Sequence, residues 1–442
     1  MKIRITCLGV LLALSAAGAA SPQEASPPAP LRSVTVGDAV KSVLERNHSL
    51  KEAEDAVAMF EARVGESRSR LLPQVRADLA YSRIAPLEEI AIPGFGVFQL
   101  YPSNNYDLHL GGSQLIYDFN RSRESVNLSR SQVTSAADRS EILKRDLSFQ
   151  TVQLFYSIIF LQDSLRVQKE TVTTLNDHLA VARKKLEAGT ATELDILNTQ
   201  VRLVGSQNQV VDLEAAREKQ LAGLRRLMGL EEQVPLELTG GFTYRPQALD
   251  PEGLIRRASQ NRLETKAVQD MIRSADIQAR LAGLVDRPSL SLNVLAGWKN
   301  GYIPNLNIWK LNYVAAVAAA VPIFNGCLAR SMKAEAEANI RSLRDRSKDI
   351  EGLIRTEVVQ AVADVRSATL KLESVEVNVV RAEKALEFAR SRYEAGTVTN
   401  LDLLDTEDAR AQAELLRIQA LFQFVLSRLE LLRAVGDPPD SE

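Results

Sequence analysis

The histidines and cysteines are the first residues to consider, because they carry most catalytic and metal-binding chemistry near neutral pH. His48, His109 and His178 lie far apart in unrelated segments, and we expect His178 on the polar side of a long helix. The two cysteines, Cys7 and Cys327, are also far apart. The chain contains no H-E-x-x-H motif, no phosphate-binding loop and no nucleophile elbow. These residues predict no catalytic site, no metal site and no cofactor, so we expect a protein that is not an enzyme.

A second group of chemically active residues lies in a turn that occurs twice. Residues 182–199 and 389–406 align without a gap, and both contain the string E-A-G-T-x-T-x-L-D. In the second copy Asp402 and Asp405 are three residues apart, which places both on one face of a helix. The first copy keeps Asp195 but has Asn198 in the other position. A carboxylate in the first turn of a helix also stabilises the helix dipole, so a purely structural role is an alternative.

The duplicated turn belongs to a repeat that fills the chain. The offset of 207 residues continues to Gly229 and Gly436, and upstream Phe119-Asn120 corresponds to Phe324-Asn325 at a slightly smaller offset. Self-similarity of this kind indicates two structural copies of one unit. We therefore expect two internal repeats of about two hundred residues each.

Each repeat is expected to contain a long helical hairpin. Between Arg121 and Glu187 there is neither Gly nor Pro, so an uninterrupted helix there would be about 100 Å long. Apolar residues recur at alternating spacings of four and three, a pattern that predicts a left-handed coiled coil. The positions are Leu154, Ile158, Leu161, Leu165, Gln168, Val172, Leu175, Leu179, Ala182 and Leu186, with matching positions in the second copy. Gly189 and Gly396 fit the helix ends, and Thr192 and Thr399 can cap the returning helices.

Strand-like segments precede each long helix. From Gln74 to Ser82 and from Ser289 to Trp298, apolar and polar residues alternate with a period of two. This alternation is typical of a barrel strand that has one face towards lipid. A weaker alternation over 105–119 and over 310–324 suggests two more strands, the second of which could also be helical. Residues 83–105 fit an exposed loop.

Composition and targeting signals limit the location. The net charge of −2 includes no basic excess of the kind that nucleic-acid binding requires. Lys2 and Arg4 precede an apolar run, and Ala17-Gly18-Ala19 fits a cleavage site, so we interpret residues 1–20 as a secretory signal. The expected division then continues with a linker at 21–34, a first repeat at 35–234, an inter-repeat segment at 235–250, a second repeat at 251–436 and a tail at 437–442. Each repeat would hold an opening helix, two strands (about 73–82 and 105–119; about 288–299 and 310–324) and a helical hairpin (121–230; 327–436).

The pattern resembles the TolC family of outer-membrane efflux proteins. The resemblance is carried by the doubled G-T-x-T-x-L-D-x-L turn, the Phe-Asn strand exits and the opening helix that ends in R-S-R-L-L-P-Q-V. It implies a mixed α+β fold in which a homotrimer builds a helical coiled-coil barrel and a twelve-stranded transmembrane β-barrel, with four strands per protomer. It also implies a passive exit duct of a tripartite efflux or type I secretion system in a Gram-negative envelope. The implied partners are a periplasmic adaptor, an inner-membrane pump and outer-membrane lipid.

The same resemblance assigns roles to residues of the turns. Asp402, Asp405 and Asp195 would surround a periplasmic aperture, and Tyr393 with Asp195 would form a gate latch. The family's latch arginine is Val398 here, and Arg390 or Arg392 could replace it. Adaptor hairpins would dock at the tips, namely at Gly189, Thr190, Gly396 and Thr397.

One alternative remains from the sequence. A periplasmic coiled-coil scaffold or adaptor without a channel would also contain helical hairpins. Such adaptors usually carry one hairpin flanked by small β-domains, whereas this chain has two hairpins and amphipathic strands. The two hypotheses predict different fractions of the cell envelope.

Overall fold

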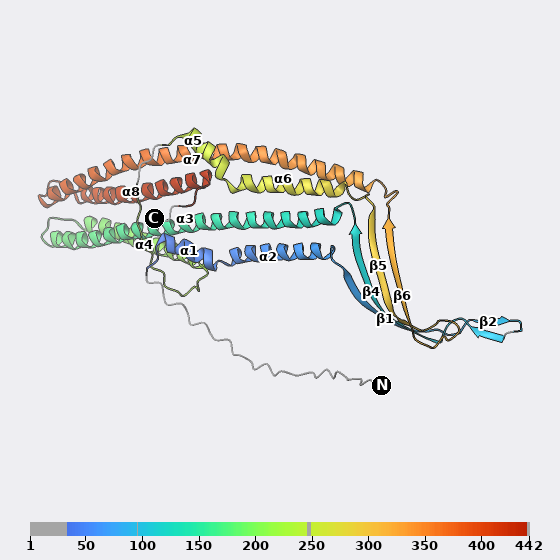
Figure 1. Ribbon diagram of the computed structural model, residues 1–442. Helices are drawn as coiled ribbons and strands as arrows, with labels where there is room; N and C mark the ends of the chain where they lie inside the picture. The colour runs from blue at the N-terminus through green and yellow to red at the C-terminus, as the bar shows by residue number, and fades with distance from the viewer. Residues whose placement is uncertain (1–32, 95, 245–248, 440–442) are drawn as a thin grey trace, which may run out of the picture.

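The computed structural model describes residues 33–94, 96–244 and 249–439. The expected signal peptide and most of the expected linker lie outside this range. Figure 1 shows an elongated protein in which long helices lie side by side and a four-stranded sheet extends from one end of them. The structure therefore contains both of the predicted parts, the helical hairpins and the strands.

The first repeat contains four helices and four strands. The helices are α1 (Val36–Arg46), α2 (His48–Ser69), α3 (Arg121–Glu187) and α4 (Glu193–Leu227), and the strands are β1 (Gln74–Arg83), β2 (Glu89–Ile92), β3 (Gly96–Gln99) and β4 (Asn104–Tyr117). The short β2–β3 hairpin lies within the stretch for which the sequence predicts only a loop. Figure 1 places this hairpin at the far end of the sheet, away from the helices.

The second repeat contains four helices and two strands. They are α5 (Pro251–Asn261), α6 (Leu263–Ala282), β5 (Ser289–Lys299), β6 (Lys310–Ala320), α7 (Leu328–Glu394) and α8 (Asn400–Val435). The sequence predicts a single opening helix in each repeat. In the structure this helix is interrupted at Asn47, between α1 and α2, and at Arg262, between α5 and α6. Both residues have extended backbone angles, with ψ of 126° and 123°, which end one helix and begin the next.

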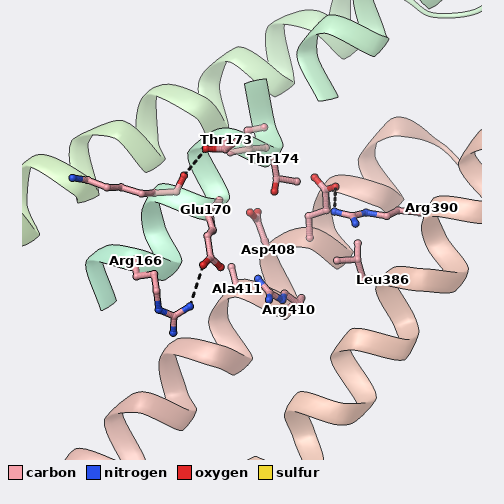
Figure 2. Close-up of a pocket in the computed structure, with 13 residues that line it drawn as sticks. Arg166, Glu170, Thr173, Thr174, Leu386, Arg390, Asp408, Arg410 and Ala411 are labelled. Atoms are coloured by element: carbon pink, nitrogen blue, oxygen red, sulfur yellow. Dashed lines mark hydrogen bonds and ion pairs between the residues drawn. The ribbon is translucent and has the colours of Figure 1, made fainter. Parts of the chain in front are cut away.

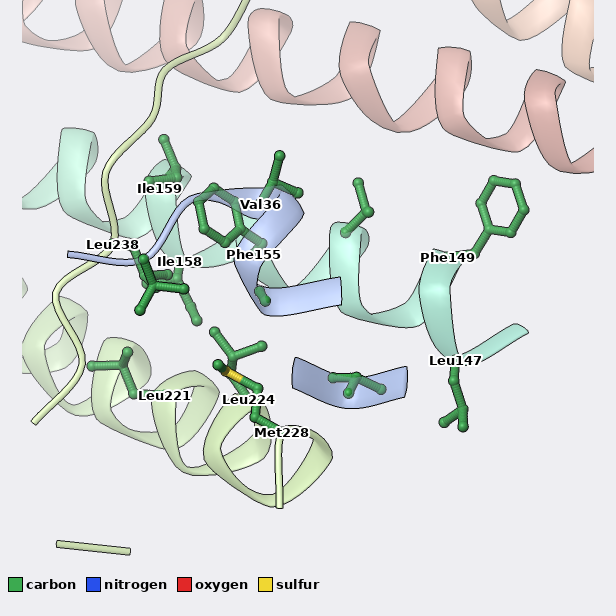
Figure 3. Packing of buried hydrophobic residues seen from close by; sticks show 14 of the residues in the cluster. Val36, Leu147, Phe149, Phe155, Ile158, Ile159, Leu221, Leu224, Met228 and Leu238 are labelled. Carbon is green, nitrogen blue, oxygen red and sulfur yellow. The ribbon is translucent and has the colours of Figure 1, made fainter. Parts of the chain in front are cut away.

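The two hairpins pack as the apolar spacing predicts. On α7 seven of the ten predicted seam positions are buried, namely Ala361, Val365, Ala368, Leu372, Val379, Leu386 and Tyr393. A cluster of Leu175, Leu179, Leu203 and Leu404 joins α3, α4 and α8, so the first hairpin (α3 and α4) also contacts the second hairpin (α7 and α8). Figure 3 shows a larger core where α1 packs on α3 and α4 around Phe155, Leu224 and Met228. The hairpins thus form one packed unit.

The main sheet is antiparallel, with strand order β1-β4-β5-β6. Leu79, Leu108, Trp298 and Leu311 pair in one row across all four strands and lie on one face. The adjacent row, on the other face, contains Asp78, His109, Gly297 and Asn312. The alternation predicted from the sequence therefore produces one apolar and one polar face. The exposed fractions of Leu79, Trp298 and Leu311 are 76%, 50% and 67%, so the protomer leaves the apolar face uncovered.

Two strands end earlier than the sequence predicts. β4 ends at Tyr117 because Phe119 and Asn120 adopt left-handed angles, with φ of 57° and 66°, and begin the turn into α3. β6 ends at Ala320, shortly before Pro322, which has no amide hydrogen to continue the ladder. No helix within the described residues is long and apolar enough to span a membrane.

Candidate functional site at the hairpin tips

Each hairpin ends in a turn built by the same local interactions. Gly189 and Gly396 have φ angles of +72° and +74°, a conformation that favours glycine at the end of a helix. The amide of Thr190 donates to the carbonyl of Lys185 at 2.8 Å, and the amide of Thr397 donates to the carbonyl of Arg392 at 2.9 Å. A Cβ at either glycine would meet nothing within 4 Å. The backbone angle therefore accounts for these glycines, and both turns are exposed.

The returning helices begin with identical capping boxes. The Thr192 hydroxyl accepts from the amide of Asp195, whose carboxylate accepts from the Thr192 amide at 2.8 Å. Thr399 and Asp402 repeat this arrangement, with the Thr399 amide at 2.9 Å from the carboxylate. Hydrogen bonds from the hydroxyl and then the amide of Thr399 lower the pKa of Asp402 below its usual value. Both aspartates thus have a structural role in capping a helix, and their role at an aperture stays a prediction.

Asp405 has a partner that the sequence does not predict. Its carboxylate lies 2.6 Å from Nη2 of Arg202, which belongs to α4 of the other hairpin. The same guanidinium contacts the carboxylate of Asp408, one helical turn further along α8. The Asp405 side chain remains 61% exposed. The two hairpins are therefore joined by an ion-pair cluster just inside the tips.

Tyr393 is buried near the end of α7. Nζ of Lys185 lies 3.7 Å from the centre of its ring and donates to its backbone carbonyl at 3.0 Å. Burial, and secondly the charge of Asp195, raise the pKa of Tyr393 above its usual value. Among the described residues no hydrogen bond joins the Tyr393 hydroxyl to Asp195, and Arg390 pairs with Glu407 at 3.4 Å. The structure brings Tyr393 and Asp195 near each other, and the latch itself stays a prediction.

His178 is buried, so the expectation that it lies on the polar side of its helix is wrong. Its Nε2 donates to the side-chain oxygen of Asn400 at 2.6 Å, and its ring centre lies 5.4 Å from that of Tyr393. Asn400 in turn donates to the backbone carbonyl of Asp195 at 3.3 Å. Asn400 therefore connects α3, α4 and α8. The only hint in the sequence is that His178 precedes Leu179, which lies on the coiled-coil seam.

A groove runs between the hairpins next to this cluster. It has a volume of about 660 Å³ and is lined by residues of α3, α7 and α8. Figure 2 shows Glu170 and Asp408 on facing sides of the groove, with Arg390 on the α7 side. Glu407 is buried in its wall, and burial raises the pKa of Glu407 above its usual value. The groove is thus a charged surface feature between the two hairpins.

On the polar face of the sheet His109 is held between neighbouring strands. It contacts Asp107 on its own strand, and its ring lies 2.8 Å from the side-chain oxygen of Asn312 on β6. The strand between them has Gly297 at this level, where a Cβ would lie 2.8 Å from the His109 ring. The same Cβ would lie closer still to the backbone carbonyl oxygen of Leu108, so the glycine allows the close approach of the β4 backbone as well as the position of the imidazole. The described residues contain no group of three or more His, Cys, Asp or Glu side chains that could hold a metal ion.

Comparisons with known proteins agree with this architecture. The family model described as outer membrane efflux protein matches residues 39–230 and 254–437. The chain is 24% identical over 393 residues to the outer membrane protein TolC of Vibrio cholerae, covering 86% of this chain and 85% of the relative. It is also 24% identical over 406 residues to the pyoverdine export outer membrane protein OpmQ of Pseudomonas putida, covering 88% and 83%.

Solved structures show the same fold. The outer membrane channel CmeC of Campylobacter jejuni matches with a TM-score of 0.79 and 17% identity, over 91% of this chain and 85% of that one. The outer membrane protein VceC of Vibrio cholerae matches with a TM-score of 0.75 and 17% identity, over 92% and 97%. Both similarities extend over the helices and the sheet.

Proposed function

The chain belongs to the outer membrane efflux protein family, and from this premise we propose that three copies form a passive exit duct through the outer membrane. The duct would serve a tripartite efflux or type I secretion system, docked to a periplasmic adaptor and an inner-membrane pump. Its helical part would lie in the periplasm. The pump would supply the energy, so the duct requires no catalytic residues.

The observation that carries this proposal is the continuous apolar face of the sheet. Lipid is the surrounding that makes such an exposed face favourable, because apolar side chains leave water there. Aromatic residues lie at both ends of the face. The ring centres of Tyr81 and Tyr106 are 5.2 Å apart at one end, and those of Tyr117 and Phe119 are 4.9 Å apart at the other. Tyrosines at the two borders of an apolar band are typical of proteins that cross a membrane. A soluble scaffold would have no use for this face.

The unpaired edges of the sheet support a trimer. β1 and β6 each have a partner on one side only. Within lipid an open edge leaves backbone groups without hydrogen bonds, and barrels of a single chain begin at about eight strands. Three protomers with four main strands each would close a barrel of twelve, with β6 of one copy beside β1 of the next.

A second uncovered surface lies on α4. Leu194, Leu197, Val201, Val204 and Val211 follow the coiled-coil spacing and are 54–72% exposed. Ile196, Thr199 and Leu203, which face the neighbouring helices, lie on the opposite side of α4. An exposed seam of this kind requires another helix, and a neighbouring copy would provide it. The helical part would then close into a tube as the sheet closes into a barrel.

The tips would form the periplasmic end of the tube. We propose that Asp402, Asp405 and Asp195 border its aperture, and that Tyr393 with Asp195 contributes to the closed state. The exposed turns at Gly189, Thr190, Gly396 and Thr397 would receive the adaptor. Their position at the end of the hairpins farthest from the sheet supports this assignment (Figure 1).

Fractionation and electrophysiology test the proposal. We expect the protein in the outer-membrane fraction, as a trimer that resists SDS and forms ion-conducting pores in planar bilayers. Asp195→Ala is expected to raise the leak of the closed pore if the latch exists, and unchanged conductance would reject the latch alone. A single copy that remains soluble without detergent would overturn the whole proposal.

A further inference from the structure

We propose that Arg202 is the internal counter-ion of Asp405 and Asp408, and that it thereby limits the cation selectivity of the tip aperture. The inference rests on the proposed function, because selectivity has meaning only for a channel. It concerns a residue that no feature of the repeated turn identifies. Arg202 lies on α4, whereas both carboxylates lie on α8.

The geometry of the cluster places one cation between two anions. Nη2 of Arg202 lies 2.6 Å from Asp405, and Nη1 contacts Asp408. The Arg202 side chain is 24% exposed, against 61% for Asp405 and 38% for Asp408. The guanidinium is therefore the least exposed group of the three. It lies beside Leu203, which packs with Leu404 in the cluster that joins the hairpins.

The repeat explains why this cluster exists only once in the protomer. At the positions of Asp405, Asp408 and Ala409, the first copy has Asn198, Val201 and Arg202. The second copy thus supplies two anions where the first has none, and the first supplies a cation where the second has alanine. Two copies with the residues of the first repeat, or two with those of the second, could not form this pair. The divergence of the repeats is complementary in charge, which favours a role for the contact across the hairpins.

Charge balance gives the functional consequence. Of the other nearby carboxylates, Glu407 pairs with Arg390, whereas Asp402 accepts hydrogen bonds from the neutral Thr399 and keeps its charge with or without Arg202. Without Arg202, Asp405 and Asp408 would add two uncompensated negative charges per protomer. With it, only one remains. Ion pairs at exposed positions contribute little to folding, so we expect the effect of Arg202 in permeation and less in stability.

The test is the reversal potential of single pores in a KCl gradient, with Arg202→Gln as the variant. We expect the ratio of potassium to chloride permeability to rise about sevenfold, because one extra negative charge at roughly 7 Å in water favours the cation about threefold and disfavours the anion about threefold. Arg202→Lys should keep the wild-type ratio. Arg217→Gln is the matched control, because Arg217 lies on the same helix and pairs with Glu218, its neighbour in sequence.

A triple variant completes the experiment. Adding Asp405→Asn and Asp408→Asn to Arg202→Gln removes the anions together with the cation, and the permeability ratio should then fall below that of Arg202→Gln. If Arg202→Gln forms SDS-resistant trimers and pores with an unchanged ratio, the counter-ion role is excluded. A change in conductance alone, with the ratio unchanged, also excludes it. If the wild-type protein forms no pore, the proposed function fails instead.

Discussion

The two hairpin tips have the same backbone and different side chains where they meet. Both turns keep a glycine with a positive φ, a threonine cap and an aspartate in the capping box. Across the contact, however, Arg202 faces Asp405 and His178 faces Asn400, and none of these pairs has a counterpart in the other copy. Residues that determine the turn have thus been retained in both copies. Residues that connect the two copies have become complementary.

The junctions between the short helices differ in the same way. Gly229 and Gly436 both end a hairpin with a positive φ, and a Cβ there would lie 2.9 Å from Arg46 O and 3.1 Å from Asn261 C respectively. In the first repeat Asn47 donates to the carbonyl of Leu227 at 2.9 Å. In the second, Arg262 donates to the carbonyl of Ala434 at 3.2 Å and also to two glutamates. The second junction thus has a network of charged side chains where the first has the single side-chain amide of Asn47.

The largest difference between the repeats is expected when these two residues are removed. Arg262 is 8% exposed and binds Glu264 at 2.9 Å and Glu357 at 2.7 Å. Arg262→Ala leaves both carboxylates without this partner and should lower the free energy of unfolding by about 3–5 kcal/mol. Asn47→Ala removes a cap and one hydrogen bond, and should lower it by about 1–2 kcal/mol. Urea unfolding measures both changes, provided that the free energy of unfolding depends on the urea concentration with the same slope in each variant.

Equal effects of the two substitutions would contradict the view that the second junction is the stronger one. Arg257→Ala serves as a control, because Arg257 pairs with Asp437 near the same helix end but its side chain is 59% exposed. We expect Arg257→Ala to lower the free energy of unfolding by at most about 1 kcal/mol. The comparison then separates burial from charge.

A smaller change in the free energy of unfolding is expected from Glu264, a carboxylate of the second junction that acid can protonate. Burial of Glu264 would raise its pKa, but hydrogen bonds from Arg145 and then Arg262 outweigh burial and lower it from 4.5 to about 2. A carboxylate with a lowered pKa in the folded state contributes stability that is complete above the unfolded value and is lost as the pH falls through the folded value. Glu264→Gln should lower the free energy of unfolding by about 1.5–3 kcal/mol at pH 7.

The difference between wild type and Glu264→Gln should stay constant down to about pH 5 and shrink between 4.5 and about 2. Unfolding curves recorded over this pH range test the window. A difference that disappears already near neutral pH would show that another group titrates. The first junction has Asn47, an uncharged residue, in the position of Arg262, so Asn47→Ala should show no such window.

The sequence predicts those parts of the fold that depend on local pattern. The absence of Gly and Pro predicts α3, the seam spacing predicts which side of α7 is buried, and alternation predicts the two faces of the sheet. It does not predict the pairs Arg202–Asp405 and His178–Asn400. Their members are more than two hundred residues apart, so their contact depends on which sides of the hairpins meet.

The wrong expectation for His178 has the same cause. A histidine beside a seam position is exposed in an isolated two-helix hairpin, and it is the second hairpin, through Asn400 of α8 and Tyr393 of α7, that covers His178. The single opening helix expected in each repeat fails for a different reason. Neither Asn47 nor Arg262 is a strong helix breaker, and the extended backbone at these positions is fixed by contacts with the ends of α4 and α8.

The smallest effect is expected where the two tips are alike. Thr192→Ala and Thr399→Ala each remove the hydroxyl that accepts from the third residue of the helix. Each should destabilise its own helix start by about 1 kcal/mol, with equal size in both copies, because the capping geometry is the same. Amide hydrogen exchange in the first turns of α4 and α8 measures the two changes separately. A clearly larger effect at Thr399 would mean that Asn400, which follows it and bonds to His178, transmits the loss of the cap into the contact between the hairpins. The tips would then differ in their backbone stability as well as in their connecting side chains.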